Sequence, residues 1–107
     1  MKNISPQEAF ELVSAGLAYG IDVREENEWD AGHSDLFTLH PLSTFDAVKI
    51  STDKPVIFTC RSGKRSAQAC DLLQAHGVEA SNMTGGMLEW QAVQLPMVAS
   101  NGTPLIS

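Results

Sequence analysis

The feature that most limits the fold is a short apolar run that leads into a polar loop and then into a helical pattern. Val56-Ile57-Phe58-Thr59 is β-branched and aromatic, which is typical of a buried central strand. Residues 60–65 follow as a polar loop, and Ala69 and Leu73 then recur at helical spacing until Gly77. This order predicts an α/β fold with parallel strands and right-handed crossovers.

The rest of the chain repeats this alternation. Ser5-Pro6-Gln7-Glu8 resembles a capping box and predicts a helix start, and Gly16 predicts the end of that helix. Ligands in parallel α/β folds bind beyond the carboxyl ends of strands, so we expect the segment after Thr59 at that edge. The other expected elements are strands at 17–23, 36–39 and 80–83, a helical turn at 25–30, and helices at 43–50 and from Met87 to Leu95-Pro96.

Composition limits the classes of partner. The 107 residues suit one domain, expected at residues 1–98, followed by a flexible C-terminal tail at 99–107. A formal charge of −6 disfavours nucleic acid and anionic membranes as partners. The first ten residues lack the apolar segment of a secretory signal, so the expected location is cytoplasmic. The cysteines and histidines show no ligand spacing, and we expect no metal.

The basic residues near Cys60 point to a specific chemistry. Arg61, Lys64 and Arg65 are three of only seven basic residues in the chain. A cysteine is nucleophilic as a thiolate, which a helix N-terminus, neighbouring cations and inward-facing amides all stabilise. Gly63 allows the backbone to curl into such an anion nest. The alternative is a buried structural cysteine followed by a solvated basic loop.

Three motifs together resemble the rhodanese family over nearly the whole chain. Ile21-Asp22-Val23-Arg24-Glu25, with Trp29 and Gly32-His33, resembles the family's opening signature. Residues 60–67, Cys-Arg-Ser-Gly-Lys-Arg-Ser-Ala, resemble its active-site loop, and Gly85-Gly86 with Trp90 and Leu95-Pro96 resembles its closing signature. The resemblance implies a central five-stranded parallel sheet flanked by helices on both faces.

The resemblance also implies an activity. A single-domain rhodanese is a sulfurtransferase whose cysteine, here Cys60, becomes a persulfide and passes the outer sulfur to an acceptor. The expected donor is a small anion such as thiosulfate or a persulfide, and the expected acceptor is a thiol, cyanide or a protein. No metal or organic cofactor is implied. The expected substrate-binding residues are Arg61, Ser62, Gly63, Lys64, Arg65 and Ser66.

Two other functions stay open from the sequence. A rhodanese-like fold could carry sulfur to a protein, or dock with one, without turning over small molecules. A related phosphatase or arsenate reductase would have its arginine six positions after the cysteine, whereas position 66 is Ser66 and the arginine falls at Arg65.

Other residues have structural interpretations. Residues 34–39 depart from the family pattern, which leaves the shape of that segment open. Cys70 is expected to be a buried hydrophobic residue, with a resolving cysteine as the alternative. Asp22 and Arg24 are expected to form a structural ion pair, and Trp90 to lie in the core.

Overall fold

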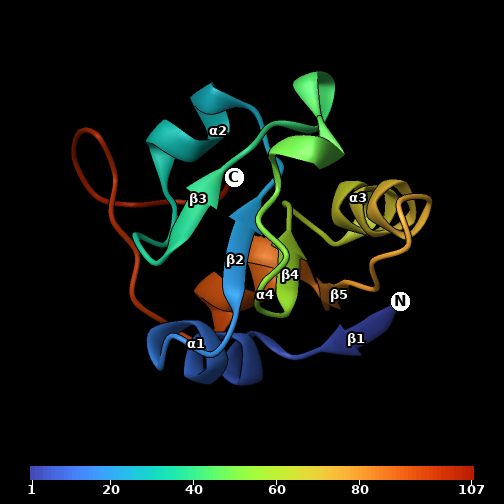
Figure 1. Cartoon of the computed structure of the whole chain (residues 1–107). Helices are drawn as coiled ribbons and strands as arrows, with labels where there is room; N and C mark the ends of the chain where they lie inside the picture. Colours follow the sequence, from blue (N-terminus) through green and yellow to red (C-terminus); the bar gives the residue numbers. More distant parts are fainter.

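Strand β4 (Val56–Thr59) lies at the centre of the sheet, and all of its residues are buried. In the computed structural model, which describes residues 1–107, the strand order is β1-β5-β4-β2-β3 and every pairing is parallel (Figure 1). The expected five-stranded parallel α/β sheet is therefore confirmed. The other strands are β1 (Lys2–Ile4), β2 (Tyr19–Asp22), β3 (Phe37–Leu39) and β5 (Ser81–Met83).

Helices cover both faces of the sheet, as expected. One buried cluster joins β2 and β4 to Ala69 and Leu73 of α3. The other joins the sheet to α1 and α4, with Trp90 fully buried at its centre and the ring of Phe37 edge-on to it at 5.6 Å. None of the helices is long and apolar enough to cross a lipid bilayer. The helices are α1 (Pro6–Ser14), α2 (Glu26–Ala31), α3 (Lys64–Gln74) and α4 (Gly86–Ala92).

Local sequence signals account for several helix boundaries. The hydroxyl oxygen of Ser5 accepts a hydrogen bond from the Glu8 amide at 3.1 Å, which satisfies one of the free amides at the start of α1. Gly77 follows α3 with a φ of +79°, the left-handed conformation that glycine adopts without penalty.

The helix expected at residues 43–50 is wrong. The structure has two short 3₁₀ turns here, η1 (Leu42–Thr44) and η2 (Ala47–Lys49), separated by extended backbone. Asp46 interrupts the helix because its carboxylate accepts a hydrogen bond from the Val48 amide, while its own amide donates to His40. Both bonds use main-chain amides that a continuous helix would pair with main-chain carbonyls.

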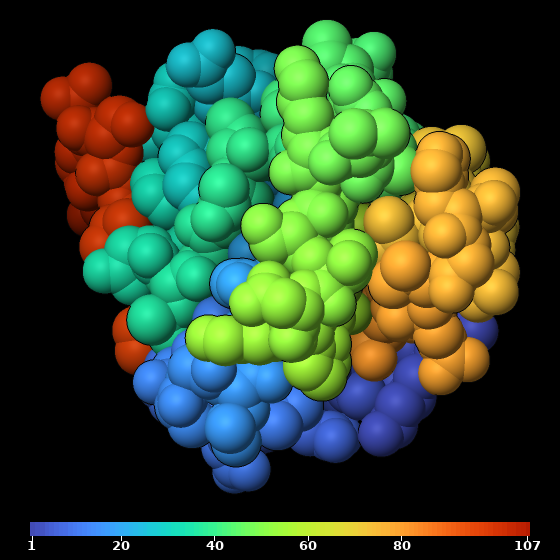
Figure 2. Space-filling view, viewed as in Figure 1, coloured from blue at the N-terminus to red at the C-terminus, as the bar shows by residue number.

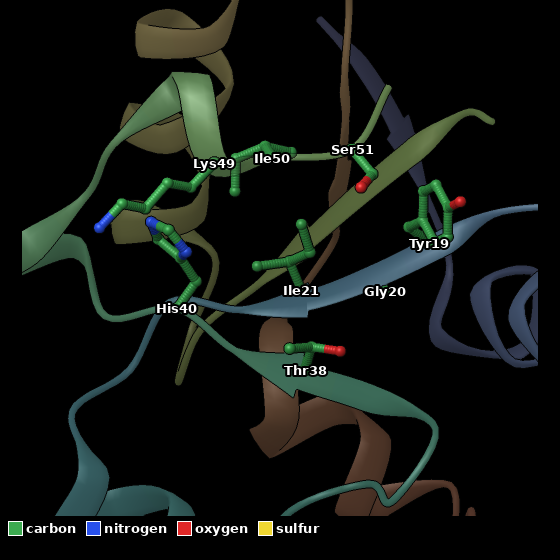
Figure 3. A pocket seen from close by; sticks show the side chains of 8 residues that line it. All are labelled: Tyr19, Gly20, Ile21, Thr38, His40, Lys49, Ile50 and Ser51. Carbon is green, nitrogen blue, oxygen red and sulfur yellow. The ribbon is translucent and has the colours of Figure 1, made fainter. Parts of the chain in front are cut away.

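A cavity of about 210 Å³ lies between these turns and the sheet. Figure 2 shows β2 at the bottom of the hollow, between β3 and the segment that precedes β4. Figure 3 shows Thr38 and Ile21 on its floor, with Ile50 and Ser51 opposite them. No residue of the Cys60 loop lines this cavity.

Residues 99–107, expected to be a flexible tail, make specific contacts with the domain. Ile106 is only 5% exposed and belongs to the cluster around Trp90. The Leu105 amide donates to the carbonyl of Ala31 at 3.0 Å. The division at residue 98 stays a prediction, but the hydrophobic cluster includes a side chain from beyond it.

Candidate active site around Cys60

Cys60 follows β4 directly and stands at the carboxyl edge of the sheet. The residue is 1% exposed. The chain then turns through Gly63, which adopts a φ of +103° and caps the N-terminus of α3. This left-handed turn favours glycine, and it bends the loop back around the sulfur.

Hydrogen-bond donors converge on the Cys60 sulfur. The Gly63 amide lies 3.1 Å from Sγ and the Ser66 hydroxyl lies 3.4 Å from it. Burial raises the pKa of Cys60, while the hydroxyl and the amide of Ser66 lower it. The amides of Gly63 and Ser62 lower it further, and the resulting pKa lies below the ordinary cysteine value. These donors favour the thiolate because they donate to the charged sulfur.

A buried side chain on the neighbouring strand holds these donors in place. Asn82 of β5 accepts a hydrogen bond from the Ser66 hydroxyl at 2.5 Å, so the single hydroxyl proton is shared between Asn82 and the longer contact to Cys60 Sγ. The Asn82 amide also donates to the carbonyl of Gly63 at 3.2 Å. One amide group therefore fixes both the serine and the turn. Asn82 could not be predicted from the sequence, because nothing near position 82 indicates that β5 lies beside β4.

The start of α4 holds the outer side of the loop. The Met87 amide donates to the carbonyl of Cys60 at 2.7 Å, and the Leu88 amide donates to that of Arg61 at 3.0 Å. Gly86 permits this approach, since a Cβ there would lie 2.6 Å from the Arg61 carbonyl oxygen. The two bonds fix the carbonyls of Cys60 and Arg61 toward α4.

The three basic residues of the loop lie in different environments. Arg65 forms a two-pronged ion pair with Glu28 of α2, at 2.7 and 2.8 Å. Hydrogen bonding to Arg65 holds the pKa of Glu28 at about 2, well below its usual value of 4.5. Lys64 is exposed and forms no ion pair. Arg61 donates from Nε to the main-chain oxygen of Ser107 at 2.6 Å.

Comparison with known proteins places the chain in a family. A family model described as the rhodanese-like domain matches residues 5–93. The chain belongs to the rhodanese family. Its domain is 41% identical over 73 residues to the uncharacterized protein YqhL of Bacillus subtilis, covering 65% of this chain and 58% of the relative. It is also 42% identical over 55 residues to a sulfurtransferase of Allochromatium vinosum, covering 50% of this chain and 51% of the relative.

A solved structure supports the same assignment. A rhodanese-related protein from Thermoplasma volcanium superposes with a TM-score of 0.83 at 25% identity, covering 92% of this chain and 98% of that chain. The chain spans only 58% and 51% of the two curated relatives above, so their full activities belong to longer proteins. What they share with this chain is the rhodanese domain of a sulfur-transfer family.

The rhodanese opening signature has a structural role. Arg24 is 1% exposed, and its guanidinium donates to the Asp22 carboxylate at 2.7 Å. This bears out the structural ion pair expected from the sequence. Arg24 also donates to the carbonyls of Glu28 and Gly32, which tie α2 to the end of β2. The pair thus helps to position Glu28, which in turn binds Arg65.

Two other features of this rhodanese domain lie away from the sulfur. Cys70 is buried in α3, and burial raises its pKa to about 11, which leaves it a neutral thiol. The departure at residues 34–39 forms the turn before β3 and β3 itself, where Phe37 packs against Trp90. Of those residues, Thr38 lines the cavity between the 3₁₀ turns and the sheet, away from the Cys60 loop.

Proposed function

We propose that this rhodanese domain transfers sulfane sulfur through a persulfide on Cys60. The observation that carries the proposal is the convergence of the Gly63 amide and the Ser66 hydroxyl on the Cys60 sulfur at the N-terminus of α3. Such a cradle lowers the thiol pKa and can stabilise a terminal persulfide sulfur in the same way, because both are sulfur anions.

The reaction has two balanced steps. The Cys60 thiolate attacks the outer sulfur of thiosulfate, the sulfur–sulfur bond of the donor breaks, and sulfite leaves with the electron pair. An acceptor thiolate then attacks the outer sulfur of Cys60–S–S⁻, which releases a new persulfide and regenerates the Cys60 thiolate. Cyanide as acceptor leaves as thiocyanate. Neither step needs a metal or an organic cofactor.

The proposed roles of the loop residues follow from their positions. The main-chain amides of Ser62 and Gly63 and the hydroxyl of Ser66 would stabilise the sulfur anion. Arg61 and Lys64 would attract the anionic donor, because neither is paired with an Asp or Glu side chain. Arg65 would act indirectly and would not bind the donor itself, since its guanidinium is bound to Glu28.

The position of Arg65 disfavours a phosphatase. A phosphatase of this loop type binds phosphate with a free arginine at the end of the loop. Here both terminal nitrogens of Arg65 bind Glu28 instead. Hydrolysis of a generic aryl phosphate is therefore expected to be absent.

Intact mass spectrometry tests the proposal directly. Incubation with thiosulfate should add one sulfur atom to the protein, and cyanide should remove it. Cys60→Ser should accept no sulfur, and Cys70→Ala should still accept one. Persulfide formation without catalytic turnover would support the sulfur-carrier alternative. Failure of wild type to take sulfur from thiosulfate or from an organic persulfide would overturn the proposal.

A further inference from the structure

The Ser66 hydroxyl stands between two acceptors and has a single proton to give. Its oxygen lies 2.5 Å from Oδ1 of Asn82 and 3.4 Å from Sγ of Cys60. A hydroxyl group rotates to suit its partners, so it points its proton at one of these two atoms at a time. Beside a neutral thiol, the shorter contact to Asn82 is the better hydrogen bond, whereas a thiolate is a charged and stronger acceptor. The direction of the hydroxyl therefore depends on the charge of the sulfur.

The alternative acceptor stays in place whichever way the hydroxyl turns. Strand β5 pairs with β4 at the register Phe58 to Asn82, beside the loop (Figure 1). The side-chain nitrogen of Asn82 donates to the Gly63 carbonyl, which fixes the amide independently of Ser66. Ser66 is 0% exposed and Cys60 is 1% exposed. In such a buried site a polar group without a partner is costly, so a hydroxyl with two possible acceptors is satisfied in either state of the sulfur.

The charge on Sγ changes twice in each cycle of the proposed reaction. Sγ is a thiolate before the donor arrives, and it is bonded and neutral in Cys60–S–S⁻, in which the charge lies on the outer sulfur. When an acceptor thiolate attacks that outer sulfur, the bond between the two sulfurs breaks and Sγ leaves with the electron pair. Thiol–disulfide exchange is faster when the leaving thiol has a lower pKa. A donor aimed at Sγ therefore assists the step in which Cys60 leaves.

We propose that the Ser66 hydroxyl alternates between Asn82 and Cys60 Sγ, and that it stabilises Cys60 as the leaving thiolate in the second step. The inference rests on the proposed function above, and it gives Ser66 a catalytic role at Sγ that differs from binding the substrate. Asn82 is the positioning residue. It accepts the hydroxyl while Sγ is bonded to the outer sulfur, and it gives the hydroxyl up as negative charge returns to Sγ. The hydroxyl turns and keeps its proton throughout.

The charged groups around the loop are left unchanged by the substitutions that test this inference. Arg65 acts on Cys60 through its charge and is paired with Glu28. Asp22 and Arg24, at the end of β2, are paired with each other. Changes at positions 66 and 82 therefore alter the hydrogen bonds of the sulfur without removing any of these charges. The other charged side chains of the loop are Arg61 and Lys64.

A neutral adduct isolates the step in which Cys60 leaves. In a Cys70→Ala background, methyl methanethiosulfonate converts the Cys60 thiolate to Cys60–S–S–CH₃ and releases methanesulfinate. Dithiothreitol then attacks the outer sulfur, and Cys60 leaves as a thiolate. Intact mass spectrometry follows both steps, at a pH at which Cys60 is ionised in both proteins.

Ser66→Ala should affect the two steps differently. Release of the adduct should slow by roughly threefold or more, because the leaving thiolate loses a hydrogen bond. Formation of the adduct should be at least as fast as in wild type, because a less stabilised thiolate is the better nucleophile. A merely structural role of Ser66 would change both rates in the same direction, through disturbance of the loop.

Asn82 is tested through its influence on the effect of Ser66→Ala. Asn82→Ala removes the competing acceptor, so Ser66→Ala should slow release by a larger factor in that background. Asn82→Asp supplies a charged and stronger acceptor, so the factor should shrink there. Each factor is measured within one background, which cancels any general effect of position 82 on the loop. Asn3→Ala is the matched control, because Asn3 is the exposed register partner of Asn82 on β1 and should leave the factor unchanged.

The outcomes separate this inference from the proposed function. Equal slowing of both steps by Ser66→Ala, or no slowing of release, would show that the hydroxyl does not assist the leaving sulfur. A Ser66 effect of the same size in every background would overturn the alternation with Asn82. If Asn82→Ala does not fold, the Asn82→Asp comparison decides alone. If release responds as expected but no donor forms a persulfide, the alternation stands and the proposed function fails.

Discussion

Hydrogen-bond donors, more than the neighbouring cations, define the environment of the Cys60 sulfur. The sequence predicted that Arg61, Lys64 and Arg65 would surround the thiolate. In the structure Arg65 is bound to Glu28 and Arg61 to a main-chain oxygen. The groups that lower the pKa of Cys60 are the Ser66 hydroxyl and main-chain amides of the loop.

Ser66→Ala should therefore raise the pKa of Cys60. Loss of a hydrogen bond to a charged group corresponds to roughly one pH unit, at the low end because the contact is long at 3.4 Å. The measurement is the rate of iodoacetamide alkylation against pH, in a Cys70→Ala background. Ser62→Ala is the matched control, because Ser62 acts through its main-chain amide and should leave the midpoint in place. Equal midpoints in wild type and Ser66→Ala would contradict this account.

Glu28→Gln should destabilise the protein in a pH-dependent way. The folded-state pKa of Glu28 is lowered to about 2 from 4.5, so the carboxylate stabilises the fold above about pH 4.5. This contribution is lost as the pH falls toward 2. We expect a loss of about 1–2 kcal/mol at neutral pH, allowing for partial solvent screening.

Urea unfolding at several pH values measures the Glu28 effect. The difference in unfolding free energy between wild type and Glu28→Gln should shrink as the pH falls below about 4.5. Glu26→Gln, at an exposed position on the same helix, makes the same change of charge and should cost much less. A difference that is constant with pH would mean that the ion pair with Arg65 is not its source.

At the scale of elements, α4 and the Cys60 loop form one unit. Gly86→Ala should break that unit, because the added methyl group would lie 2.6 Å from the Arg61 carbonyl oxygen. We expect the unfolding free energy to fall by about 2–4 kcal/mol, because the substitution adds both steric overlap and the strain of a left-handed alanine. Gly77→Ala isolates the strain, since Gly77 has a φ of +79° and nothing within 4 Å of its Cβ position.

Two measurements test Gly86→Ala: thermal unfolding for stability, and the pH dependence of Cys60 alkylation for the geometry of the loop. Gly77→Ala should lower the unfolding free energy by only about 1–2 kcal/mol and should keep the wild-type alkylation profile. Gly86→Ala should lose more stability and shift the alkylation midpoint upward, because the loop carbonyls lose their α4 partners. Equal effects of the two substitutions on both measurements would show that α4 does not hold the loop.

The elements with strong local patterns were predictable from the sequence, and the weak ones were not. Val56–Thr59 is a continuous apolar run, and the structure places it at the centre of the sheet. Strand β1 went unpredicted because only Ile4 of its three residues is buried, which gives no periodicity. The helix expected at 43–50 failed because the Asp46 side chain competes for main-chain amides.

At the scale of the whole molecule, the C-terminal segment closes the core around Trp90. Ile106→Ala should lower the unfolding free energy by about 2–4 kcal/mol, since the side chain is only 5% exposed. Leu105→Ala is the matched control. The Leu105 side chain is 59% exposed, so its truncation should change the unfolding free energy by less than about 0.5 kcal/mol. Urea unfolding measures both, and similar values would show that the segment does not pack as described.

The long-range contacts of the site could not be predicted from the sequence. The loop around Cys60 was predicted from residues within a few positions of it. Asn82 and Glu28 reach that loop from 19 and 37 positions away, through the order of the strands and the placement of α2. Gln91 binds the segment at Ile106 through a turn that no local pattern indicated. Such pairings depend on the finished sheet.

The position of Asn82 has a consequence for the order in which the protein matures. Residues 60–66 leave the ribosome before the segment with Asn82 and Gly86, which fixes their geometry. Strand β5 must dock on β4 before Asn82 can hold both Ser66 and Gly63. A nascent chain therefore carries Cys60 as an ordinary thiol. We therefore expect the lowered pKa of the Cys60 thiol only after β5 has docked on β4.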